Sequence, residues 1–177
     1  ALLLADPENG GITAQLIEAD IYINVQGDEP LFNPDDLRLL LETATQHPEQ
    51  VINGYCPVSD EQSFRSTSIP KVVFRPDGRL LYMSRAPIPT DKQQGFHTAW
   101  RQVCAYAFPA KALKEFSSAN TKSPLEAIED IEILRFLELG WEVKMIQMST
   151  ASIAVDTPED IPKVERALLA AAKLADG

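Results

Sequence analysis

Residues 21–25 read Ile21-Tyr22-Ile23-Asn24-Val25 and lead directly into Gln26-Gly27-Asp28-Glu29-Pro30. The first run is β-rich and shows little alternation, which is typical of a strand buried on both faces of a parallel sheet. An N-cap and proline at Asn33-Pro34, followed by leucines at helical spacing, predict a helix over residues 34–46. A second strand is expected over residues 51–58. Strand, helix and strand in this order predict a parallel pair with a right-handed crossover.

The middle of the chain predicts a different kind of strand pairing. Pro76-Asp77-Gly78 is a strong turn signal between two apolar runs, residues 71–74 and 80–84. The pattern predicts an antiparallel hairpin, which could stand apart from the sheet as a flap. A further strand is expected over residues 103–108.

The last third of the chain predicts helices around two more strands. Ser123-Pro124-Leu125-Glu126 combines an N-cap, a first-turn proline and the acid of a capping box, and its apolar stripe ends at Gly140. Residues 141–148 and 152–155 are expected strands, and Thr157-Pro158 begins a final helix. The predicted class is α/β, with a mixed, mostly parallel sheet flanked by helices and an antiparallel hairpin flap.

Composition excludes several classes of function. The 177 residues carry a formal net charge of −10, which argues against a nucleic-acid or anionic-membrane surface. Apolar runs such as residues 167–172 are too short to span a bilayer. Cys56 and Cys104 form no CxxC or metal motif, so we expect free thiols and a cytoplasmic location. The length suits one domain over residues 1–177.

Two aspartates are candidate metal ligands. Asp28 follows the strand at residues 21–25, and Asp156 ends an apolar run before a helix. Ligands of open α/β sheets bind at such strand ends, and carboxylate oxygens suit Mg²⁺. Asp28 could equally be a solvated turn acid, and Asp156 an acid favoured by the helix dipole.

Arginine and glutamate side chains supply further candidates. Arg85 lies between an apolar strand and two rigid prolines, which would aim its guanidinium at a carboxylate or phosphate. An ordinary surface ion pair is the alternative. One predicted helix carries the acidic set Glu126, Glu129, Asp130 and Glu132 together with Arg135, and on it Glu132 shares a face with Glu129 and with Arg135. A solvated helix face would explain these charges as well. The sequence contains no GxGxxG, GxxxxGK[ST], HExxH or GxSxG motif.

With these segments identified, the chain resembles the 3-deoxy-manno-octulosonate cytidylyltransferases, or CMP-Kdo synthetases. The matching motifs occur in the family's order, and they are Asn24-Val25-Gln26-Gly27-Asp28-Glu29-Pro30, Ser84-Arg85-Ala86-Pro87-Ile88-Pro89, Ser123-Pro124-Leu125-Glu126, Leu134-Arg135 and Val155-Asp156-Thr157-Pro158-Glu159-Asp160. The resemblance implies a three-layer nucleotidyltransferase-like fold in a cytoplasmic, usually dimeric, Mg²⁺-dependent enzyme. Such enzymes couple CTP to an acidic sugar and release pyrophosphate, in lipopolysaccharide precursor synthesis.

The resemblance also assigns roles to individual residues. Asp28 and Asp156 correspond to the catalytic, metal-binding pair, and Gln26 to a residue at the nucleotide–sugar junction. The positions that correspond to sugar contacts are Arg85, Gln102, Tyr106 and Glu132.

The chain departs from the family pattern in three places. Gln102 stands where the family commonly has a histidine, and Ile133 where a glutamine usually follows the glutamate. The family's N-terminal phosphate loop is not recognised before Asp20, so we expect an N-terminally incomplete nucleotide site. These departures leave open a related enzyme for another acidic sugar, or an inactive dimerising fragment. Leu81 of the hairpin could face a partner or cover the chain's own core.

Overall fold

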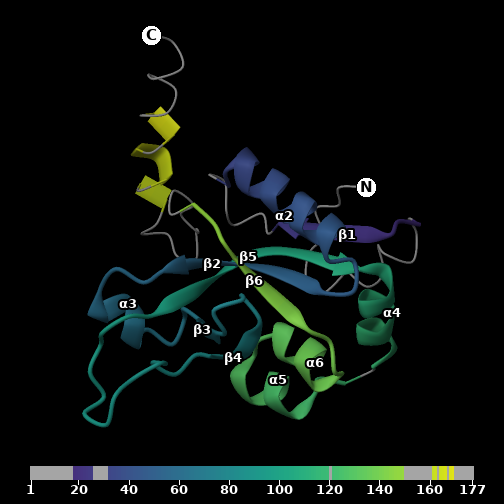
Figure 1. Cartoon of the computed structure of the whole chain (residues 1–177). Coiled ribbons are helices and arrows are strands. Elements are labelled where there is room, and N and C mark those ends of the chain that lie inside the picture. Colours follow the sequence, from purple (N-terminus) through teal and green to yellow (C-terminus); the bar gives the residue numbers. More distant parts are fainter. Residues whose placement is uncertain are drawn as a thin grey trace.

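Figure 1 shows the computed structural model, which describes residues 18–25, 32–119, 121–149 and parts of 161–169. The strands are β1 (Ile21–Val25), β2 (Val51–Pro57), β3 (Lys71–Phe74), β4 (Leu80–Ser84), β5 (Trp100–Pro109) and β6 (Val143–Gln147). The helices between them are α2 (Pro34–Gln46), α3 (Glu61–Arg65), α4 (Ala110–Ser118), α5 (Pro124–Glu129) and α6 (Ile133–Glu138). The alternation of strands and helices confirms the predicted α/β class.

The long strand β5 organises the sheet. The order is β4-β3-β5-β2-β6, and β1 also pairs with β5. β2 pairs with most of the length of β5. β3 pairs with the start of β5, and β1 pairs with the end of β5. β1 and β2 therefore run in the same direction but are separated by β5. The prediction of a parallel pair was wrong in this respect, because a later strand inserts between the two.

The described sheet is mixed, but it is not mostly parallel. Only β2 and β6 pair in parallel among the described strands, and the other pairings are antiparallel. The β3–β4 hairpin is not a separate flap, because β3 pairs with β5 and extends the sheet. Local sequence patterns predicted the strands themselves, but strand direction depends on which distant strand each one meets.

Helices cover both faces of the sheet (Figure 1). On one face Leu40 and Ala44 of α2 pack in a cluster with Ile52 and Ala107. On the other face α4 and α6 pack against β2, β4 and β6, and Phe136 stacks between aromatic rings of β5 and α4. This arrangement is the expected three-layer architecture.

The helix predicted up to Gly140 is interrupted. Asp130 adopts the left-handed conformation with φ of 54°, and it ends α5 before α6 begins. Within the predicted apolar stripe Ile131 and Leu134 are buried, but Ile128 is 79% exposed and Leu139 is 41% exposed, so the hydrophobic pattern was correct only in part. Short helix α3 was not predicted, although the Asp60 carboxylate accepts a hydrogen bond from the Ser63 amide in the usual N-cap manner.

No helix in the described part of the chain is long and apolar enough to cross a membrane.

Candidate functional site

A buried polar cluster lies between β2 and β5. The Gln102 Nε2 group donates to Asn53 Oδ1 at 3.2 Å and to the Tyr106 hydroxyl at 3.1 Å. Asn53 is fully buried, and Gln102 is 8% exposed. The structure thus brings Gln102 and Tyr106, which were both predicted as substrate contacts, into direct contact with each other.

Asparagine side chains flank Tyr106 on both neighbouring strands. Asn24 on β1 and Asn53 on β2 are its register partners, so the three side chains form a row on one face of the sheet. The Oδ1 atom of Asn24 is buried and has no hydrogen-bond partner. A buried acceptor of this kind costs about 1–3 kcal/mol, and an unsatisfied group is typical of a site that receives a donor from a ligand or water.

Arg85 is held by backbone carbonyls. Its Nε, Nη1 and Nη2 atoms donate to the carbonyl oxygens of Glu129, Thr67 and Asp130 at 2.6, 3.0 and 2.9 Å. Asp130 also has a carboxylate oxygen 3.9 Å away, and the Arg85 side chain is 33% exposed. A guanidinium has five N–H bonds, so two of them have no acceptor among the described residues. The carbonyl contacts orient the group, and although the carboxylates of Asp130 and Glu129 offset part of its charge, two N–H bonds remain to bind an anion.

Two ionic groups, one buried and one half-buried, hold the Arg85 backbone. Lys71 is fully buried, and its ammonium donates to the carbonyl oxygens of Ser66, Ile69 and Arg85 at 2.6, 2.6 and 2.8 Å. The Glu129 carboxylate accepts from the Arg85 amide at 2.9 Å and from the Ser84 hydroxyl at 2.6 Å. Desolvation acts against the charged form of Glu129, but these hydrogen bonds outweigh it and lower the pKa of the carboxyl. The loop that carries Arg85 is thereby tied to both β3 and α5.

Glu132 lies at the start of α6, two residues after the Asp130 carbonyl that holds Arg85. Its side chain is exposed at the surface. Desolvation by the surrounding protein, together with the charge of Glu126, raises the pKa of the Glu132 carboxyl. The segment at residues 129–132 therefore holds Arg85 through two backbone carbonyls and also carries the Glu132 carboxyl, whose pKa is raised.

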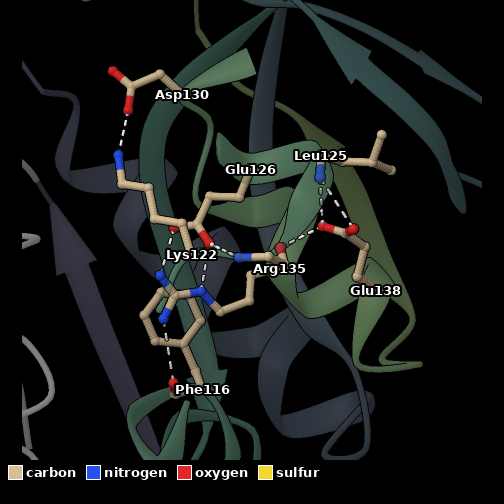
Figure 2. Close-up of polar contacts among 8 residues, drawn as sticks. Phe116, Lys122, Leu125, Glu126, Asp130, Arg135 and Glu138 are labelled. Atoms are coloured by element: carbon tan, nitrogen blue, oxygen red, sulfur yellow. Dashed lines mark hydrogen bonds and ion pairs between the residues drawn. The ribbon is translucent and has the colours of Figure 1, made fainter. Parts of the chain in front are cut away.

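The sequence predicted a helix face shared by Glu132 and Arg135, but Arg135 forms no ion pair with Glu132. Arg135 instead forms a two-pronged ion pair with Glu126, at 2.5 and 2.7 Å, and its guanidinium lies 3.9 Å from the centre of the Phe116 ring (Figure 2). Glu126 is 1% exposed, so this carboxylate belongs to the core and not to a solvated helix face. The break at Asp130 turns α6 relative to α5, which is why helical spacing did not predict the partner.

Asp28, Gln26 and Asp156 lie outside the described residues, so their predicted roles stay predictions. Within the described ranges, no group of three or more His, Cys, Asp or Glu side chains could hold a metal ion. The described residues therefore provide the candidate sugar contacts, and the candidate metal ligands remain expectations from the sequence.

A sequence pattern decides the family. The pattern of the cytidylyltransferases matches residues 12–152, which is most of the chain. This chain belongs to the cytidylyltransferase family.

Individual members of the family cover the same region. A 3-deoxy-manno-octulosonate cytidylyltransferase of Acidobacterium capsulatum is 40% identical over 159 residues, which are 89% of this chain and 64% of that protein. An enzyme of the same name from Protochlamydia amoebophila is 35% identical over 153 residues, with coverage of 84% and 59%. The chain thus spans less than two thirds of the length of these family members.

A solved structure of CMP:2-keto-3-deoxy-manno-octonic acid synthetase in complex with CTP is similar in fold. It superposes with a TM-score of 0.82 at 31% identity, over 93% of this chain and 68% of that one. This chain is therefore similar to that synthetase both in sequence and in three-dimensional fold, and the mixed sheet with its flanking helices is the fold of this family.

Sequence reasoning missed the residues that support the site. Asn53 is a polar residue inside an otherwise apolar strand, and Lys71 is a charged residue at the start of another. Either could have been noticed, because a charged or amide side chain in a buried strand needs a specific partner. Asn53 donates to carbonyls about 50 residues away, whereas Lys71 donates to Ser66 and Ile69 nearby in the chain and to Arg85, and no local pattern predicts these contacts.

The raised pKa of Glu132 predicts an effect of pH on stability. A carboxyl that binds its proton more readily when folded stabilises the fold below its ordinary pKa, and that contribution is lost as pH rises through the raised value. Glu132→Gln is therefore expected to raise the melting temperature at pH 7 and to change it little at pH 4. Thermal unfolding at the two pH values measures this. Equal shifts at both would contradict the assigned environment.

Proposed function

We propose that this protein transfers CMP from CTP to the anomeric hydroxyl of 3-deoxy-manno-octulosonate (Kdo) and releases pyrophosphate, in the synthesis of lipopolysaccharide precursors. The observation that carries the proposal is 34–40% identity with 3-deoxy-manno-octulosonate cytidylyltransferases over 84–89% of the chain. The match in fold to a synthetase that was solved with CTP supports it further. The reaction forms a bond from the sugar oxygen to the α-phosphorus, breaks the bond to the β-phosphate oxygen, and gives the hydroxyl proton to solvent.

The described residues suit an acidic sugar. Arg85 offers its two uncommitted N–H bonds to a carboxylate, and carbonyl contacts already hold it in one orientation. Gln102 and Tyr106 present polar atoms to hydroxyl groups, and Glu132 can accept from another. In-line displacement depends mainly on how the attacking hydroxyl group is positioned. Side chains that are already held in one orientation would position the sugar for this attack.

Asp28 and Asp156 would hold Mg²⁺, since paired carboxylates that follow strands are the ligand type this ion takes. Bound Mg²⁺ supplies charge neutralisation for the triphosphate and the leaving pyrophosphate. This role offsets the formal net charge of −10, which by itself repels both anionic substrates.

Pyrophosphate release by the complete enzyme tests the proposal. Turnover with CTP, Mg²⁺ and Kdo is expected, with Kdo preferred over other acidic sugars. Asp28→Asn and Asp156→Asn are each expected to reduce turnover at least 100-fold while the cooperative unfolding transition is retained. Near-normal turnover by both variants would overturn the metal assignment, and equal rates with all acidic sugars would remove Kdo as the substrate.

Two alternatives follow from specific observations. Gln102 replaces the histidine expected from the resemblance, which favours a related enzyme for another acidic sugar. A dimerising unit without activity of its own is the second alternative, for which the exposed Leu81 is a candidate contact. Calorimetric titration with CTP and Mg²⁺ separates the second alternative from the others, because a folded chain that produces no heat would support it.

We also propose that the protein is a cytoplasmic homodimer, and the exposed face of β4 is a candidate contact. Leu81 is 58% exposed, whereas its neighbour Leu80 is buried. Leu81→Asp is expected to shift the mass measured by light scattering from dimer to monomer, because a carboxylate in an apolar contact is strongly unfavourable. Leu41→Asp on α2, where the leucine is 49% exposed, is the matched control. A dimeric Leu81→Asp protein would exclude this surface.

A further inference from the structure

The Asn53 amide has only one possible orientation. Its Nδ2 atom lies 2.9 Å from the Val103 carbonyl oxygen and 3.0 Å from that of Ala105. A carbonyl oxygen can only accept, so both positions require the amide N–H bonds and Oδ1 must point the other way. The register between β2 and β5 shifts at Asn53/Gly54, and the Asn53 side chain supplies donors to the β5 backbone at this irregularity.

The orientation of the Asn53 amide fixes the orientation of the Gln102 amide. Asn53 Oδ1 is an acceptor, so the group facing it at 3.2 Å must be the Gln102 amide nitrogen. The second N–H bond of this nitrogen is directed to the Tyr106 hydroxyl at 3.1 Å. Both amide protons are then engaged, and Oε1 is the remaining polar atom. No described residue donates a hydrogen bond to Gln102 Oε1.

We infer that Asn53 is a positioning residue that holds Gln102 with Oε1 available as a hydrogen-bond acceptor for one hydroxyl group of the sugar. The inference rests on the proposed function, because it takes Gln102 to line the sugar site. Asn53 itself is fully buried and does not reach a ligand. It acts through Gln102, whose side chain is the more exposed of the two.

The arrangement has a consequence for specificity. A neutral histidine can present either a donor or an acceptor, depending on its tautomer. Gln102 held by Asn53 presents only an acceptor, so it selects for a hydroxyl group and against a hydrogen or an ether at the same position. Sites that hydrogen-bond a substrate group discriminate strongly against analogues that lack it.

Binding of Kdo and its monodeoxy analogues tests the inference. Wild-type protein is expected to bind the analogue that lacks the hydroxyl group contacted by Gln102 about 10–100-fold more weakly than Kdo. Asn53→Leu keeps the volume but frees Gln102, so the penalty for that analogue is expected to fall to about twofold, while the affinity for CTP stays unchanged. Gln50→Leu is the matched control, because the Gln50 amide makes a 3.3 Å contact to Glu142 at the surface and the Asn53–Gln102 bond remains, so discrimination should persist. An unchanged penalty in Asn53→Leu would overturn the inference.

A second measurement needs neither sugar nor an Asn53 variant. The two side-chain amide protons of Gln102 are expected to exchange with solvent at least tenfold more slowly than those of the exposed Gln93 in NMR of the free protein. Tyr106→Phe should release one of the two. Equal exchange for Gln102 and Gln93 would contradict the positioning role even if Asn53→Leu does not fold. If exchange is slow but no sugar binds, the proposed function fails while the orientation of Gln102 stands.

Discussion

Arg135→Met is expected to lower the free energy of unfolding by about 3–5 kcal/mol, the range typical for breaking a buried ion pair from one side. The substitution leaves Glu126 as a carboxylate that is 1% exposed and without its cation. It also removes the guanidinium from the Phe116 ring. Urea denaturation followed by circular dichroism measures the loss, provided that the slope of the transition is unchanged.

Two further variants separate the buried charge from the lost packing. The double variant Glu126→Leu/Arg135→Met removes both charges, so it is expected to recover most of the stability. Arg38→Met breaks an exposed ion pair with Asp35 on α2 and is expected to cost less than about 1 kcal/mol. A double variant as unstable as Arg135→Met alone would show that packing, and not the unpaired carboxylate, carries the effect.

Lys71→Met is expected to lower the free energy of unfolding by about 3 kcal/mol, because three carbonyl oxygens lose a charged donor and each unsatisfied acceptor costs about 1–3 kcal/mol. Relief from burying an ammonium offsets part of this loss, and desolvation already lowers the pKa of Lys71. Chemical denaturation of the variant measures the net change.

The same substitution is expected to affect the site. Lys71 holds the Arg85 carbonyl, so its loss should loosen the Arg85 loop and weaken sugar binding about tenfold, while CTP binding is retained. Lys144→Met is the control, because that ammonium makes a single 3.2 Å contact to the Asp77 carbonyl at the surface. Equal losses in the two variants would contradict the special role of Lys71.

Much of the local structure could be predicted from the chain itself. The N-cap at Asn33 and the proline after it begin α2 where the pattern indicated, and the β3–β4 hairpin turns at Pro76-Asp77-Gly78. Caps, turns and hydrophobic spacing act within a few residues, so they can be recognised without knowing the rest of the fold. The candidate sugar contacts Arg85, Gln102 and Tyr106 were predicted from motifs that resemble a family.

The tertiary structure decided which of these groups meet. Glu126 was expected on a solvated face and is instead the buried partner of Arg135, because α5 ends at Asp130. Gln102 contacts Tyr106 directly and is also bonded to Asn53, which lies 49 residues before it in the chain. In this protein, short-range steric and capping effects determined where helices and strands begin, whereas the position of β5 between β1 and β2 and the break at Asp130 determined the partners of Gln102 and Arg135. Such contacts join residues that are distant in the chain. A buried polar group needs a hydrogen-bond or ionic partner, and the tertiary fold decides which group lies close enough to be that partner.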